Sequence, residues 1–123
     1  MRNHHPRVLS TSTLTGNDVR NAQNENLGSI RDFVIDLESG EIVYAVLSFG
    51  GFLGMGDKLF ALPWQKLGVD TENECFVLDV TKESLEDAPG FDKNDWPRRP
   101  QMDFINRVHT FYGYEPYYQE ALL

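Results

Sequence analysis

A glycine-rich stretch is the first place in this 123-residue sequence where residue type and spacing could support chemistry. Residues 50–57, GGFLGMGD, carry four glycines around Phe52, Leu53 and Met55. A phosphate-binding loop needs a following helix, so that backbone amides and the helix dipole meet the anion. A strand pattern follows here instead, and no lysine occupies the Walker position. We interpret the stretch as a hairpin tip whose three apolar side chains either fold back over the sheet or contact a protein partner.

The cysteine and the histidines do not form a recognisable catalytic or metal-ligating set. Cys75 lies in an apolar strand pattern without a basic neighbour in the sequence, which is typical of an inert buried thiol. His109 has no evident partner and is interpreted as an ordinary surface or interface residue. His4 and His5 are adjacent but lack a third ligand at fixed spacing, so we assign them to a mobile arm over residues 1–7. The sequence therefore predicts no catalytic residue, no metal site and no cofactor.

Two carboxylates, Asp32 and Asp36, fall on the same side of a regular strand. Paired acids can titrate together or relay protons. A β-bulge between them would break that relation, and we interpret both residues as solvated strand-edge groups.

The element that must position any site is the strand from Glu41 to Phe49, which is apolar on both faces. Side chains alternate along a strand, so each face can be read directly from the sequence. A strand with two apolar faces has to be covered on both sides. We expect the curled sheet to cover it on the inside, and the C-terminal tail or a second copy to cover it on the outside. One face carries Ile42, Tyr44 and Val46, and the other carries Val43, Ala45, Leu47 and Phe49.

The remaining pattern predicts a mainly β fold with two helices. A bulge near Asp32 would restore alternation in the longest early strand, as a tightly curled sheet requires. Thr81 is placed to cap a short helix near 82–87 whose apolar anchor is Leu85. The expected strands are Arg7–Leu14, Asp18–Asn21, Leu27–Leu37, Glu41–Phe49, Lys58–Leu62, Gln65–Val69 and Cys75–Val80.

A second helix is predicted near 102–112, where apolar residues recur at helical spacing. Gly113 follows at the position where glycine commonly ends a helix. Aromatic residues are dense here, so burial against the sheet or against a second copy is favoured. The candidate partner surface in this segment comprises Phe104, Val108, Phe111, Tyr112 and Tyr114, together with Phe52, Leu53 and Met55 of the hairpin tip.

Length and composition indicate a single globular domain. The hydrophobic fraction is 41%, and the formal net charge is −8 with one cysteine. The acidic balance argues against nucleic-acid binding, which depends on clustered Lys and Arg. No signal peptide and no apolar run long enough to cross a bilayer are visible, so we expect a cytoplasmic protein.

The order of glycines and strands resembles the PRC-barrel family. The resemblance is carried by Leu27–Asp32, Asp36–Gly40, Val43–Gly54 and Leu62–Trp64, and it extends from about Val8 to Phe91. It implies a small, strongly bent β-barrel over residues 8–91, acting as a noncatalytic adaptor. Residues 92–123 would then form a linker followed by the aromatic C-terminal helix and tail.

Several functions are compatible with this resemblance. The first is a protein-binding module, likened to the cytoplasmic domain of the photosynthetic reaction centre H subunit, that forms a homodimer. An alternative is an accessory protein of photosynthetic or other electron transport, associated peripherally with a membrane complex. A ribosome or RNA-processing role is disfavoured by the acidic charge and the missing second domain. An enzyme is disfavoured because no nucleophile, base and oxyanion set converges.

Overall fold

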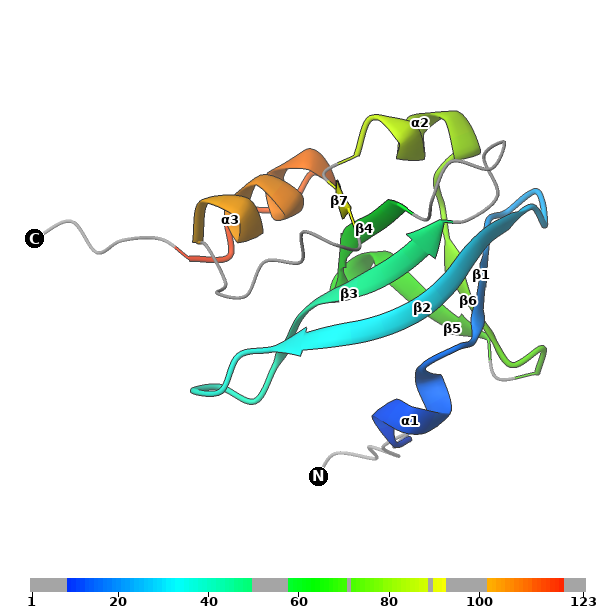
Figure 1. Cartoon of the computed structure of the whole chain (residues 1–123), viewed down its shortest axis with the longest axis horizontal. Coiled ribbons are helices and arrows are strands. Elements are labelled where there is room, and N and C mark those ends of the chain that lie inside the picture. Colours follow the sequence, from blue (N-terminus) through cyan, green and yellow to red (C-terminus); the bar gives the residue numbers. More distant parts are fainter. Residues whose placement is uncertain (1–8, 50–57, 71, 89, 93–101, 119–123) are drawn as a thin grey trace, which may run out of the picture.

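The computed structural model describes residues 9–49, 58–70, 72–88, 90–92 and 102–118 (Figure 1). Within these ranges, a seven-stranded sheet has the order β5-β6-β1-β2-β3-β4-β7. The arm 1–7, the hairpin tip with Phe52, Leu53 and Met55, and the linker residues 93–101 lie outside the described residues. The elements are α1 (Thr11–Leu14), β1 (Asp18–Arg20), β2 (Asn26–Ile35), β3 (Ile42–Phe49), β4 (Lys58–Pro63), the 3₁₀ turn η1 (Trp64–Lys66), β5 (Leu67–Asp70), β6 (Cys75–Leu78), α2 (Lys82–Glu86), β7 (Gly90–Asp92) and α3 (Met102–Phe111).

The mainly β, strongly bent barrel-like fold predicted from the sequence is confirmed. β2 and β3 form the long antiparallel pair at its centre, and β1 closes back onto β6 in parallel (Figure 1). β2 and β3 approach each other closely at Gly28. Gly28 has φ +131°, and a Cβ atom there would lie 2.1 Å from the carbonyl oxygen of Ser48. Only glycine fits at this close approach of the two strands.

The expected bulge in β2 is confirmed, and β3 contains a second one. Ile30 pairs with Leu47 while Asp32 pairs with Val46, so Arg31 is the extra residue of β2. The second shift, between Val34 and Ile35, leaves one residue of β3 without an opposite partner.

The β3 bulge corrects the two-face prediction at one end of the strand. Val34 pairs with Tyr44 and Ile35 pairs with Ile42, so Val43 is the extra residue. Val43 therefore packs with Tyr44 on the outer face, while Ile42 packs against the inner core. The sequence assigned both to the opposite faces, because strict alternation does not allow for an extra residue.

The opening segment is a second correction, since Thr11–Leu14 forms α1 rather than a strand. Ser10 caps the helix by accepting a hydrogen bond from the Thr13 amide at 3.3 Å. The Thr15 hydroxyl donates to the Thr11 carbonyl at 2.7 Å. Hydroxyl side chains that can bond to the local backbone thus outweigh the β propensity of the threonines.

The inner core fills the concave side of the sheet, and two edge-to-face aromatic pairs join Trp64 to Phe33 and to Phe76. α2 adds Leu85, which is 1% exposed, and Thr81 caps it by accepting from the Ser84 amide at 3.1 Å. The predicted cap and anchor of α2 are both confirmed. The fully buried residues of this core include Val19, Leu27, Ile30, Leu47, Leu62, Phe76, Leu78 and Leu85.

The outer face of β3 and β4 is covered by α3 from the same chain (Figure 1). We call the resulting contact the outer cluster; it comprises Val43, Tyr44, Val46, Leu59, Ala61, Phe104, Ile105 and Val108. The rings of Tyr44 and Phe104 meet edge to face with centroids 6.0 Å apart. The double covering predicted for this strand is thereby confirmed, with the C-terminal helix as the outer layer.

α3 ends just before Gly113, as the sequence predicts. Gly113 has φ +85°, its amide donates to Thr110 at 3.1 Å, and the Tyr114 amide donates to His109 at 2.9 Å. This pair of bonds is a Schellman motif, and it turns the chain back along the helix.

Candidate functional site

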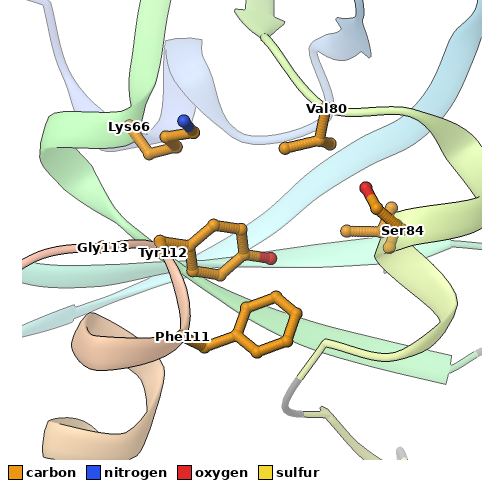
Figure 2. Close-up of a pocket in the computed structure, with 7 residues that line it drawn as sticks. Lys66, Val80, Ser84, Phe111, Tyr112 and Gly113 are labelled. Carbon is orange, nitrogen blue, oxygen red and sulfur yellow. The ribbon is translucent and has the colours of Figure 1, made fainter.

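The candidate site is a hollow at the end of the barrel, where the C-terminal end of α3 meets α2 (Figure 2). It has a volume of about 350 Å³, which lies at the small end of the range for ligand pockets. Three separate parts of the chain build it: the η1 turn, the β6–α2 segment and the last turn of α3. Its lining residues are Lys66, Val80, Ser84, Leu85, Phe111, Tyr112 and Gly113.

Tyr112 stands in the middle of this hollow, with its hydroxyl pointing toward the α2 side where Ser84 lies (Figure 2). The ring packs against the inner core. The hydroxyl oxygen is buried and has no hydrogen-bond partner among the described residues. Burial raises the pKa of Tyr112 well above its ordinary value, so the phenol remains a proton donor.

Phe111 forms the rim of the hollow and is 46% exposed. It lies seven residues after Phe104, so both face the same side of α3. Phe104 is buried in the outer cluster, whereas Phe111 stays half exposed beside the hollow. Its ring meets the Tyr112 ring edge to face, with centroids 5.0 Å apart. The apolar stripe of α3 is therefore longer than the sheet face that it covers.

Besides the Tyr112 hydroxyl, the polar groups of the lining belong to Lys66 and Ser84. Lys66 ends the 3₁₀ turn and lies across the Tyr112 ring from Ser84 (Figure 2). The Ser84 hydroxyl already donates to the Thr81 carbonyl at 2.9 Å, which leaves its oxygen as an acceptor. No carboxylate belongs to the lining described for this hollow.

The structure separates the residues predicted as a partner surface. Phe104 and Val108 belong to the buried outer cluster, while Phe111 and Tyr112 line the hollow. Tyr114 is half-buried just after the helix end. Among the predicted residues that the structure describes, Phe111 and Tyr112 are the two brought together at a concave surface.

His109, which the sequence suggested is a surface or interface residue, is only 2% exposed and packs within its own chain. Its Nδ1 lies 2.9 Å from the Ile105 carbonyl oxygen, and its Nε2 has no partner among the described residues. The ring packs on Tyr117 with centroids 5.4 Å apart. Its spacing of four residues from Ile105 and three from Tyr112 was the signal for burial on a second helical stripe.

The segment after α3 is tied back to the helix and to the sheet. The Tyr117 hydroxyl donates to Asp36 Oδ2 at 2.7 Å, at the end of β2. This bond is the main cause that lowers the pKa of Asp36 and raises the pKa of Tyr117. Asn106 and Tyr118 exchange two further bonds, of 2.9 and 3.0 Å. Asp36 is therefore a docking point for the tail, a role that the sequence did not reveal.

The hollow offers one ammonium group, two hydroxyl groups and an apolar wall. Among the described residues, no group of three or more His, Cys, Asp or Glu is placed to hold a metal ion. Cys75 is buried, as predicted, and lies outside the lining of the hollow. The helices in the described ranges include none that is long and apolar enough to cross a membrane.

A small, strongly curled β-sheet with a few short helices places the chain in the class of small β-barrel domains. Residues 6–85 match the PRC-barrel domain family model, and the chain belongs to that family. No curated protein matches the sequence. The family match ends within α2, so β7 and α3 lie beyond the matched residues. Membership favours a noncatalytic binding module over an enzyme.

Proposed function

We propose that the chain is a noncatalytic adaptor module that associates with a second copy of itself through the Phe111 end of α3. The single observation that carries this proposal is the half-exposed Phe111 ring beside a hollow of about 350 Å³. A projecting aromatic residue next to a hollow with an apolar wall forms a self-complementary surface. A two-fold axis between two copies would place each Phe111 against the partner's hollow.

The position of this contact follows from what α3 already covers. The outer face of β3, which the sequence offered as a dimer surface, is buried by Phe104, Ile105 and Val108 of the same chain. Phe111 belongs to the same apolar stripe of α3 but stays half exposed. Aromatic anchors in pockets are the residues that contribute most to protein–protein affinity.

The proposed division of the chain agrees with this placement. Residues 8–91 form the barrel module, and residues 92–123 add a covering helix that carries the association surface. The absence of a membrane-spanning helix in the described residues is consistent with the cytoplasmic location that we propose.

Sedimentation velocity at high micromolar concentration tests the proposal. We expect the wild type to be a dimer and Phe111→Ser to be a monomer with an unchanged melting temperature, because the ring is half exposed. The matched control is Leu37→Ser, since Leu37 is 92% exposed in the turn between β2 and β3. It should remain dimeric. A monomeric wild type, or a dimeric Phe111→Ser, would refute the proposed surface.

A further inference from the structure

We propose that the hollow between α2 and the end of α3 binds a monocarboxylate carried on an apolar stem. In this arrangement the carboxylate accepts a hydrogen bond from the Tyr112 hydroxyl, and the Lys66 side chain turns from the other side of the ring to pair with the negative charge. The stem lies along Val80, Leu85 and Phe111. The inference goes beyond self-association and needs only a single copy of the chain.

The head-group preference follows from the donors present. Tyr112 offers an O–H donor that no described residue accepts, and an unpaired buried donor is costly. An acceptor that reaches this oxygen removes that cost. Lys66 is the charged lining residue, and no acidic residue in the lining balances it, although the whole chain carries a net charge of −8. One cation and one hydroxyl donor match a single negative charge better than a phosphate dianion.

The stem preference follows from the walls. Val80, Leu85 and Phe111 supply apolar surface, and Gly113 adds no side chain. Phe111 is the most exposed of these walls, since its ring is 46% exposed while it rests on the Tyr112 ring. The Tyr112 oxygen is buried, so a ligand reaches it only when a neighbouring side chain moves, and we assign that movement to the exposed Phe111 ring.

The same geometry makes the ligand a competitor of self-association. A stem that occupies the hollow excludes the Phe111 ring of a second copy. This regulatory part rests on the proposed function, whereas carboxylate binding does not. The two can fail separately: a monomeric wild type that still binds the carboxylate would remove only the dimer and its regulation.

Octanoate is a suitable probe, with octan-1-ol and octylamine as controls that share its stem. The full chain is titrated by calorimetry at a concentration below that at which sedimentation detects association. We expect saturable 1:1 binding of octanoate and at least about tenfold weaker binding of both controls, since a hydrogen bond to a charged group is lost.

Two variants test the assigned atoms. Tyr112→Phe removes the unpaired hydroxyl without altering the ring, and Lys66→Gln removes the charge. Each should weaken octanoate binding about tenfold or more, while Tyr112→Phe retains or raises the melting temperature. Tyr118→Phe and Lys58→Gln, both at exposed positions, should bind as the wild type does. Equal affinity for the three probes, or undiminished octanoate binding by both Tyr112→Phe and Lys66→Gln, would overturn the inference.

Discussion

Buried tyrosines show at the residue scale how environment changes chemistry. Tyr44 lies in the outer cluster, where burial, assisted by the charge of Asp32, raises its pKa above the ordinary value of 10.0. Tyr112 is shifted in the same direction by burial alone. In the unfolded chain both phenols ionise near pH 10, so the folded state binds more protons above that pH. Their contribution to stability is complete below pH 10 and is lost as pH rises toward the folded-state pKa values.

An alkaline spectrophotometric titration checks this expectation. Tyr44 and Tyr112 should ionise above pH 10, and their ionisation should coincide with loss of the native circular dichroism spectrum. Ionisation of Tyr44 and Tyr112 near pH 10 with the native spectrum intact would contradict the burial of these two rings.

The sequence could not identify the polar residues that the fold buries. His109 and Tyr112 share a helical stripe with Ile105, but a polar side chain at such a position is compatible with either a wet or a dry face. Whether such a side chain is buried or solvated depends on what packs against the helix. Tyr117, which stacks on His109, arrives there only because Gly113 turns the chain back.

At the scale of elements, the close approach of β2 to β3 depends on Gly28. We expect Gly28→Ala to lower the free energy of unfolding by at least about 3 kcal/mol, because the new methyl group would meet the Ser48 carbonyl. Gly40→Ala is the control: φ is +77°, but no atom lies within 4 Å of the added Cβ. Its cost should be roughly 1–2 kcal/mol from backbone strain alone. Urea denaturation measures the free energy of unfolding of both variants. Equal losses would count against the close approach of β2 to β3 at Gly28.

The docking of α3 is a second element-scale expectation. Ile105 is 2% exposed in the outer cluster, so Ile105→Ala should cost about 2–5 kcal/mol of unfolding free energy. Met102 lies on the same helix but is 40% exposed, and Met102→Ala should stay within about 0.5 kcal/mol of the wild type. Chemical denaturation compares the pair. A loss for Ile105→Ala as small as that for Met102→Ala would mean that α3 is not packed on the sheet.

Most elements were predictable because their signals are local. The Thr81 cap, the Gly113 stop and the spacing of Phe104 and Val108 each act within a few residues. The bulge at Val43 and the pairing of β7 (Gly90–Asp92) with β4 were missed, since both are set by partners distant in the sequence. α1 was missed because its threonines favour strands on average, and only the capping pattern from Ser10 shows otherwise.

At the scale of the whole molecule, the chain provides its own outer layer. The two apolar faces of β3 required two covers, and an aromatic helix was available, but a sequence cannot distinguish docking within the chain from docking on a twin. The structure places α3 on the sheet of its own chain, tied by Tyr117 to Asp36. Because the family match ends at residue 85, this cover is an addition to the matched barrel.

The most direct test of this account is a nuclear Overhauser measurement between the rings of Tyr44 and Phe104, whose centroids lie 6.0 Å apart. A uniformly labelled sample should show the cross-peak. An isotope-filtered experiment on mixed labelled and unlabelled chains, which detects only contacts between copies, should not show it. A cross-peak that is present only in the filtered experiment, or in neither, would contradict the claim that α3 covers the sheet of its own chain.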